Sequence, residues 1–308
     1  MPDNTVFSFK NIGNSCYLNA GIQCLMRLPA LNAALDNVDV PNGDAGSAQH
    51  FFKEYNDLRR MALDNENCTI SPALFRHAVQ LYAKQKKNDD FSGLQQNDAC
   101  EFIQFMLHGI HDALARQEDF DSIPVETETE KKCVAMMKAT FGKEFSDIVH
   151  LCYGLQLSCI KGNMTPEAFM TLNLSIPPEA TSLEHCLRAY TADETIEGWV
   201  DETTKQTETV VRSLRFFRLP AILFLCLKRF SSDGRKNSQA IDVPVELTIG
   251  ECAYHLQCGC IHEGGPNSGH FNAFANIKGN WTVIDDDTYY PVGPKMSNNV
   301  YCVFYVQQ

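Results

Sequence analysis

The segment NIGNSCYLNAGIQCL, residues 11–25, combines the composition of a tight turn with that of a helix start. A glycine and two asparagines favour the turn, and apolar residues recur at helical spacing from Cys16 until Pro29 interrupts them. The positive end of a helix stabilises a thiolate, the form of cysteine that attacks carbonyl carbons. We therefore expect Cys16 to be a nucleophile, and the amide of Asn11 to be a donor to an oxyanion.

A second segment, GHFNAF at residues 269–274, is followed by Trp281 and by the acidic run 285–287. The alternation predicts two antiparallel strands joined by a turn at 278–280, with His270 starting the first strand and Asp285 ending the second. Such positions lie close together across the ladder. Asp285 would accept from one imidazole nitrogen while the other faces a thiol, as in a catalytic triad. A histidine or an acidic run alone is more often a surface feature, but the pairing with Cys16 favours catalysis.

The remaining pattern divides the chain into a helical half and a β-rich half. Ser71 followed by Pro72 resembles an N-cap and a first helical residue, and Asp98 with Glu101 resembles a capping box. Residues 118–130 are acidic and predict a solvated connection, and the Thr-rich residues 197–212 predict a hairpin or loop. We predict helices over 16–28, 48–63, 72–84 and from 98 onward, and strands over 221–230, 254–261, 270–277, 281–285 and 300–306.

Composition narrows the classes of partner. The formal net charge of −12 argues against nucleic acid or an anionic membrane surface as the main partner. The 13 cysteines form an odd, scattered set, which favours a reducing compartment over a secreted disulfide framework. The sequence begins with no evident signal peptide and contains no apolar run of membrane-spanning length. We therefore expect a monomeric protein of the cytoplasm or nucleus, with no nucleic acid and no membrane among its partners.

Four blocks occur in order along the chain: GNSCYLNAGIQCL (13–25), QQNDACEF (95–102), LPAILFLCLKRF (219–230), and GHFNAF followed by Trp281 and residues 285–287. Together they resemble the cysteine box, the glutamine–aspartate block, the LKRF strand and the histidine box of the ubiquitin-specific protease family. The resemblance implies an α+β, papain-like cysteine protease fold with a helical thumb, a β-rich palm and reduced fingers. It also implies a single catalytic domain over 1–308, with the thumb in 1–125, linker and fingers in 126–220, and the palm with finger strands in 221–308.

The resemblance assigns roles to individual residues. It implies that Cys16 is the nucleophile, His270 the base, Asp285 the carboxylate that orients the base, and Asn11 the oxyanion donor. Asp286 would assist through water or substitute for Asp285. The ubiquitin tail is rich in arginine, which suits an acidic cleft. The residues expected to bind that tail are Asp98, Gln96, Glu101, Gly269 and Phe271.

Two departures from the family pattern are visible. Members often hold a structural zinc with two CxxC pairs, but Gly162 stands where the second cysteine of the first pair, after Cys159, would be. Residues 199–212 contain no cysteine, and a structural zinc needs four protein ligands. We therefore expect no metal and no cofactor, and we interpret Cys258 and Cys260 as packing residues. Asn97 is the second departure, because it lies as an insertion between the two glutamines and the aspartate of its block.

The sequence thus predicts a deubiquitinating thiol protease that hydrolyses the peptide or isopeptide bond after the C-terminal glycine of ubiquitin. Two alternatives share the same fold. One is the same chemistry on another ubiquitin-like modifier, and the other is an inactive protein that binds ubiquitin without cutting it. A transferase that uses the same three residues on an acyl donor is a further alternative, but it leaves the glutamine–aspartate block and the LKRF strand unexplained.

Overall fold

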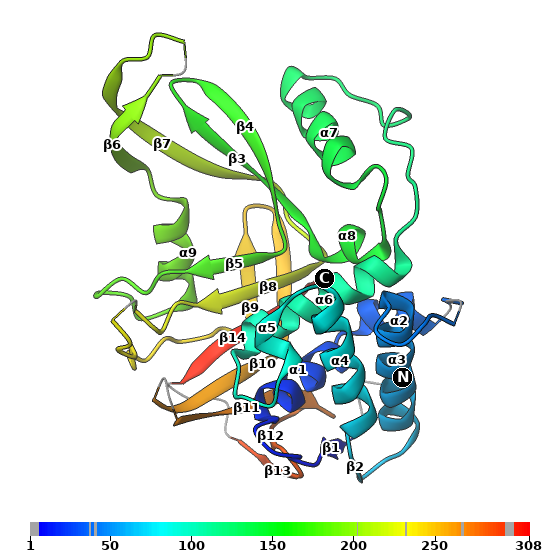
Figure 1. The fold of residues 1–308 in the computed structure, drawn as a ribbon. Coiled ribbons are helices and arrows are strands. Elements are labelled where there is room, and N and C mark those ends of the chain that lie inside the picture. The colour runs from blue at the N-terminus through cyan, green and yellow to red at the C-terminus, as the bar shows by residue number, and fades with distance from the viewer. Residues whose placement is uncertain are drawn as a thin grey trace.

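The computed structural model describes residues 6–36, 38–39, 42–201, 203–231, 233–265, 268–292 and 299–308. Its helices and strands form three groups (Figure 1). Helices from the N-terminal part of the chain pack against an eight-stranded sheet, and a four-stranded sheet extends away from both with helix α7 (Glu128–Phe141) beside it. This is the α+β organisation that the sequence predicts.

The N-terminal helices follow the predicted pattern. They are α1 (Cys16–Met26), α2 (Pro29–Asp36), α3 (Ala48–Asp64), α4 (Ala73–Gln85), α5 (Asp89–Ser92) and α6 (Ala99–Leu114). Asp98 caps α6, because its Oδ1 accepts from the N–H groups of Cys100 and Glu101 at 2.7 and 3.0 Å. Among the described residues Glu101 gives no return bond, so only half of the predicted capping box forms. The prediction for α4 was wrong by one residue: Pro72, not Ser71, occupies the N-cap position, because its ψ of 21° lies outside the helical range.

The eight-stranded sheet contains every strand that the sequence predicts for the second half. Its order is β13-β12-β11-β10-β14-β8-β5, with β9 paired to β10. The strands are β5 (Thr171–Leu174), β8 (Ile222–Leu227), β9 (Glu246–Ile249), β10 (Cys252–Gly265), β11 (Ser268–Ile277), β12 (Asn280–Asp285), β13 (Thr288–Pro291) and β14 (Val300–Gln307). Lys278 and Gly279 both have positive φ, as a two-residue hairpin turn requires. The antiparallel β11–β12 pair therefore brings His270 and Asp285 to the same end of the hairpin.

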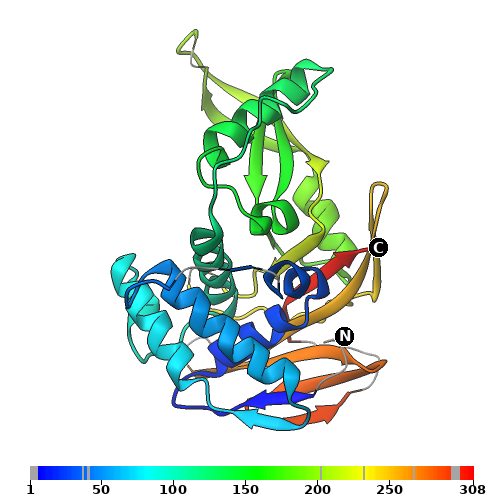
Figure 2. The ribbon, with the colours of Figure 1, turned by 90° about the vertical axis from the view of Figure 1, so that its right-hand side faces the viewer.

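The four-stranded antiparallel sheet projects from this body (Figure 2). Its order is β4-β3-β7-β6, and the elements of this region are β3 (Gly154–Ile160), β4 (Asn163–Phe169), β6 (Glu194–Val200), β7 (Thr207–Arg218), α7 (Glu128–Phe141), α8 (Asp147–Cys152) and α9 (Leu183–Thr191). The β6–β7 pair confirms the hairpin predicted within 197–212, of which residue 202 lies outside the described residues. The sequence analysis missed α7, although Thr127 and Glu130 form the capping box that starts it.

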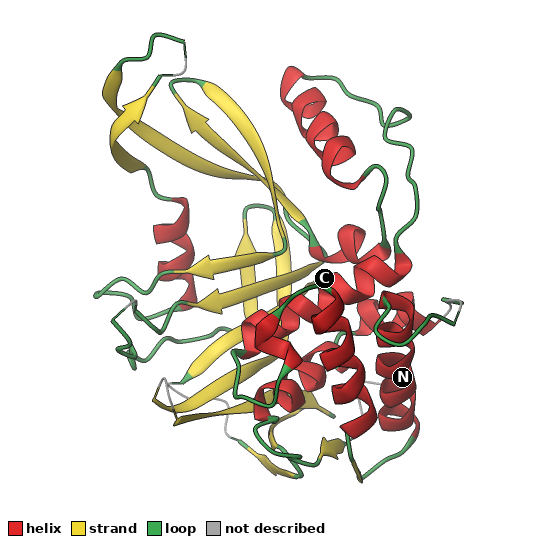
Figure 3. Cartoon of the chain, in the orientation of Figure 1, coloured by secondary structure: helices red, strands yellow, loops and turns green. Residues whose placement is uncertain are grey.

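Figure 3 shows the helices of the N-terminal part of the chain gathered beside the strands of the eight-stranded sheet. Buried side chains lie on both faces of this sheet. Every residue of β8 is buried, and successive residues point to opposite faces. Phe224 and Cys226 join the core on the helical side, whereas Leu223 and Leu225 join the core on the other side. Within the described ranges, no helix combines the length and the apolar character needed to cross a bilayer.

Helix α1 is buried along its whole length. The Cys24 sulfur lies 3.6 Å from the Cys260 sulfur, and the Cys258 sulfur lies 3.4 Å from the Cys24 carbonyl oxygen. Cys258 and Cys260 therefore pack on α1 from one face of β10, in keeping with the packing role expected of them. The parallel pair β1 (Phe7–Phe9) and β2 (Cys68–Ile70) lies next to the loop that leads into α1. These contacts fix the helix that carries Cys16 relative to the sheet that carries His270.

Candidate active site

Cys16 is the first residue of α1, and it lines a pocket between this helix and the eight-stranded sheet. Its side chain is only 3% exposed. The Ser15 hydroxyl does not cap the helix, because it accepts from the Ile12 N–H at 2.9 Å and donates to Asn11 Oδ1 at 3.3 Å. The first turn of α1 therefore has no side-chain cap, and its positive end acts on the Cys16 sulfur.

His270 and Asp285 meet across the β11–β12 hairpin, as the sequence predicts. His270 Nε2 lies 2.7 Å from Asp285 Oδ1, and the ring also hydrogen-bonds the Cys16 sulfur. Because Nε2 faces the carboxylate, Nδ1 is the nitrogen left for the sulfur. The bond to Cys16, and next the bond to Asp285, raise the pKa of His270 to about 10 although burial opposes them. The imidazole is therefore protonated at neutral pH, between a sulfur and a carboxylate.

Asp286 connects the loop before α1 to the helix itself. Its Oδ2 accepts from Asn11 Nδ2 at 2.7 Å, and its Oδ1 accepts from Asn19 Nδ2 at 2.7 Å. Asn11 Oδ1 in turn accepts from the Gly13 N–H at 2.9 Å. Asp286 thus fixes the side chain of Asn11 and uses one of its two amide hydrogens, which leaves the other free to donate. Asn19 is a residue of this site that the sequence analysis did not single out.

The pocket beside Cys16 has a volume of about 210 Å³. Four residues predicted to bind a substrate tail line it, namely Gln96, Asp98, Gly269 and Phe271, together with Asn97, Phe230 and His262. Gln96 reaches across the pocket, with Nε2 3.4 Å from the Gly269 carbonyl oxygen. Glu101 does not line the pocket but lies exposed on α6. The structure therefore gathers four of the five predicted tail-binding residues at one pocket, and Glu101 is not among them.

Asp98 makes hydrogen bonds within the protein. Its Oδ1 caps α6, and its Oδ2 accepts from the Tyr301 hydroxyl. Burial raises the pKa of Asp98, while the bonds from Tyr301 and from the Glu101 N–H oppose the rise. The neighbouring Asn97, the inserted residue, donates to the Asp90 carbonyl oxygen at 2.8 Å and so secures the loop in front of α6. A role for Asp98 in holding a substrate tail remains a prediction.

His262 is a second histidine of the site, and the sequence analysis missed it. It is 4% exposed, and its ring packs against Phe230, Phe271 and Tyr301 at centroid distances of 5.1, 4.6 and 5.9 Å. Burial, followed by the charges of Lys236 and His270, lowers the pKa of His262 to about 4. His262 is therefore uncharged at neutral pH and forms part of the pocket wall. A lone histidine in an apolar strand gives little sequence signal for such a role.

Ligand atoms of His270, Asp285 and Asp286 lie within 4.8 Å of one another, which is the one metal-like grouping in the described part of the chain. Each of these side chains already has a protein partner. His270 bonds to Cys16 and Asp285, and Asp286 bonds to Asn11 and Asn19. This arrangement of a thiol, an imidazole and a carboxylate suits proton transfer and nucleophilic attack on a carbonyl carbon.

Comparisons with known proteins identify the family to which the chain is similar. Residues 7–305 match the family model described as "Ubiquitin carboxyl-terminal hydrolase". Ubiquitin carboxyl-terminal hydrolase 21 of Rattus norvegicus is 28% identical over 96% of this chain, and ubiquitin carboxyl-terminal hydrolase 24 of Arabidopsis thaliana is 25% identical over 100% of it. The chain spans 60% and 65% of the lengths of these two relatives.

Solved structures with the same fold include the yeast SAGA DUBm with an Sgf73 mutant, at a TM-score of 0.74 and 20% identity. The SAGA Ubp8/Sgf11/Sus1/Sgf73 DUB module bound to ubiquitin aldehyde matches at a TM-score of 0.72 and 20% identity. Both matches cover 100% of this chain, and they cover 69% and 70% of the matched chains. The predicted papain-like fold of the ubiquitin-specific protease type is thereby confirmed.

Proposed function

Because the chain belongs to the ubiquitin carboxyl-terminal hydrolase family, we propose that it is a cysteine-type deubiquitinase that cuts after the C-terminal glycine of ubiquitin. The observation that carries the proposal is the meeting of Cys16, His270 and Asp285 at the end of a pocket walled by Gly269. The net charge of −12 suits a substrate whose tail is rich in arginine.

The proposed reaction begins with attack of the Cys16 thiolate on the glycine carbonyl carbon. The free amide hydrogen of Asn11 and the backbone N–H groups at the start of α1 stabilise the oxyanion. His270, protonated in the resting site, gives its Nδ1 proton to the leaving amine, and Asp285 holds the ring through Nε2. Water then attacks the thioester, with His270 as the base that accepts its proton. Asp286 acts by holding Asn11.

We propose that the ubiquitin tail enters through the pocket lined by Gln96, Asp98, Gly269 and Phe271. The pocket has a volume of about 210 Å³, and Gly269 contributes backbone without a side chain to its wall, which leaves room there for an extended chain. Glu101, which is exposed in the first turn of α6, and Asp98, which caps that helix, contribute negative charge toward an arginine-rich tail. The tail would thus reach Cys16 with its last carbonyl carbon beside the sulfur.

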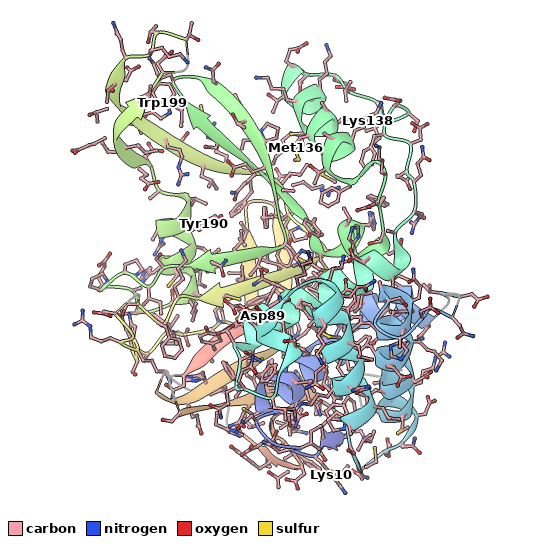
Figure 4. The ribbon with its side chains drawn as sticks, in the orientation of Figure 1. Lys10, Asp89, Met136, Lys138, Tyr190 and Trp199 are labelled. Carbon is pink, nitrogen blue, oxygen red and sulfur yellow. The ribbon has the colours of Figure 1, made fainter. Side chains whose placement is uncertain are left out.

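We further propose that residues 1–308 form one catalytic domain whose four-stranded sheet, the counterpart of the family's fingers, works without zinc. In that sheet Cys159 stands opposite Met164 and Ser213, which do not form a thiolate set. A cation links the two hairpins there instead: Lys161 Nζ lies 2.7 Å from Glu208 Oε1 and 5.5 Å from the ring centre of Trp199. Trp199 lies on β6 of this sheet (Figure 4). This contact is exposed and contributes little energy, but it occupies the junction of the hairpins.

Reaction with ubiquitin that carries an electrophile at its C-terminus tests the proposal. We expect a covalent adduct at Cys16 by peptide mapping, and none in Cys16→Ser. Half-buried Cys68, Cys159 and Cys252 serve as internal controls for general thiol reactivity. An adduct formed only with another ubiquitin-like modifier would show that this modifier, and not ubiquitin, is the substrate. Tight ubiquitin binding without any adduct would assign an inactive binding protein.

A further inference from the structure

Asn272 is a buried polar residue that lies beside the proposed catalytic site. It is 2% exposed and stands on β11, two residues after His270 and on the same face of the strand. Ala273 pairs with Ile284 in the β11–β12 ladder, so the next step of the register places Asn272 opposite Asp285. None of the roles described above uses this residue.

The neighbours of the Asn272 amide determine its orientation. One end of the amide lies 2.9 Å from Asp285 Oδ1, 3.2 Å from the Phe271 carbonyl oxygen and 2.9 Å from His270 Nε2. A carboxylate and a carbonyl group only accept, so the NH₂ group must occupy this end. Its two hydrogens then serve two acceptors, Asp285 Oδ1 and the Phe271 oxygen. The third neighbour, His270 Nε2, carries the proton that it donates to the same carboxylate oxygen.

We propose that Asn272 is a positioning residue, whose amide holds the Asp285 carboxylate in the orientation that accepts from His270 Nε2. The inference rests on the proposed function, because it concerns the same triad. Asn272 acts through Asp285 and touches neither the sulfur nor the substrate. Oδ1 of Asp285 thus receives two converging donors, one from the base and one from a fixed neutral amide.

The position of Asp285 explains why it needs a second donor. It is the last residue of β12, and its side chain is 36% exposed. Among the described residues, His270 and Asn272 are the side chains that donate to its carboxylate. The carboxylate of Asp286 lies nearby and repels it. An amide adds a donor without adding charge, so it restrains the carboxylate while leaving the ion pair with His270 intact.

Several other ionisable groups lie near His270 on different elements. A test of Asn272 must leave their charges unchanged. Cys16 faces it from α1, His262 lies on β10, and Asp286 follows β12. Glu263 on β10 is the cross-strand partner of His270, and Tyr290 on β13 interacts with both Asp285 and Glu263. A substitution at Asn272 changes none of these charges.

The test measures the pKa of His270 by NMR in ¹⁵N-histidine-labelled Cys16→Ala protein, where the sulfur no longer contributes. The signal of His270 is assigned by its absence in His270→Ala. We expect Asn272→Leu to lower this pKa by about one pH unit, because the carboxylate turns toward solvent and its interaction with the imidazolium weakens. Asn276→Leu, the same change on the same strand opposite Trp281, should leave it unchanged. With Cys16 restored, Asn272→Leu should lower kcat about tenfold and leave KM unchanged.

A double variant separates positioning from general structural damage. In an Asp285→Ala background, Asn272→Leu should cause no further fall in the pKa of His270, because the carboxylate through which Asn272 acts is absent. An unchanged pKa, a rise, or a fall that persists without Asp285 would each overturn the proposal. If Asn272→Leu does not fold, Asn272→Ala removes the same donor and carries the same expectations. The titration needs no ubiquitin, so its outcome is independent of the reaction with electrophilic ubiquitin. A failure of the positioning role and a failure of the proposed function can therefore be told apart.

Discussion

Replacing Gly269 by alanine tests how the wall of the pocket is built. Gly269 does not have positive φ, so its backbone would accept a side chain. A Cβ atom there would lie 2.0 Å from His262 Nε2, 2.6 Å from His262 Cε1 and 3.0 Å from the Gly265 carbonyl oxygen. Ordinary contact begins at 3.4 Å, so the new methyl group and the ring must separate by 1.4 Å. The His262 ring cannot yield freely, because it is buried among three aromatic rings.

The expected cost follows from this overlap. Overpacking of a buried site typically destabilises by about 1–3 kcal/mol, which corresponds to a fall in Tm on the order of 5 °C for a domain of this size. Gly269 precedes His270, and a displacement of about 1 Å at a catalytic group can lower the rate about 10²-fold. We therefore expect Gly269→Ala to fold with reduced Tm in scanning calorimetry. We also expect kcat/KM on a fluorogenic ubiquitin substrate to fall about 10²-fold.

The control substitution lies in the same β10–β11 hairpin as Gly269. Gly265→Ala introduces the same methyl group where no atom of the described, non-adjacent residues lies within 4 Å, so its stability should remain close to that of the parent protein. In a His262→Ala background the obstacle is gone, and Gly269→Ala should cost much less stability than in the parent. An equal loss of stability in both backgrounds would refute the assignment of the clash to His262. Full activity of Gly269→Ala would refute the expected displacement of His270.

Three further predictions concern the oxyanion, acid stability and metal. Asn11→Ala should lower kcat more than it raises KM, by about 10²–10³-fold if Asn11 stabilises the oxyanion; an unchanged steady-state rate would rule out that role. His262 has a folded pKa of about 4, so it stabilises the fold above about pH 6.5 and this contribution is lost as the pH falls through 4. His262→Phe should therefore lose less stability than the parent in calorimetry between those pH values. Incubation with EDTA should leave activity and Tm unchanged, whereas unfolding by the chelator would reveal a structural metal ion.

The parts of the site that the sequence predicts are those with strong local signals. Cys16 follows a turn built from glycine and asparagine and begins a helix with a clear apolar period. His270 and Asp285 flank a hairpin whose turn residues and alternating strands fix their register. The pairing of Cys16 with His270, which lie in distant parts of the chain, follows from no local pattern. The resemblance to a family brought these segments together, and the core contacts of α1 with β10 show how the fold does so.

The parts that were missed depend on tertiary contacts. Asn272 is one polar residue within a strand, and its contact with Asp285 follows only from the pairing of β11 with β12. His262 gains its role from three aromatic rings that come from separate segments. Helix α7 is a different case, because Thr127 and Glu130 carried a readable capping signal within a segment interpreted as an acidic connection.

Two histidines on adjacent strands show how the fold assigns opposite charges to similar groups. His270 bonds to Cys16 and Asp285, which raise its pKa to about 10. Burial and the charge of Lys236, whose Nζ donates to the His262 carbonyl oxygen at 2.7 Å, bring the pKa of His262 to about 4. A positive charge on His262 would repel the imidazolium of His270 and promote loss of its proton. Keeping His262 neutral therefore preserves the protonated base beside the sulfur, and any substitution that places a permanent cation at position 262 should weaken that ion pair even if the fold remains intact.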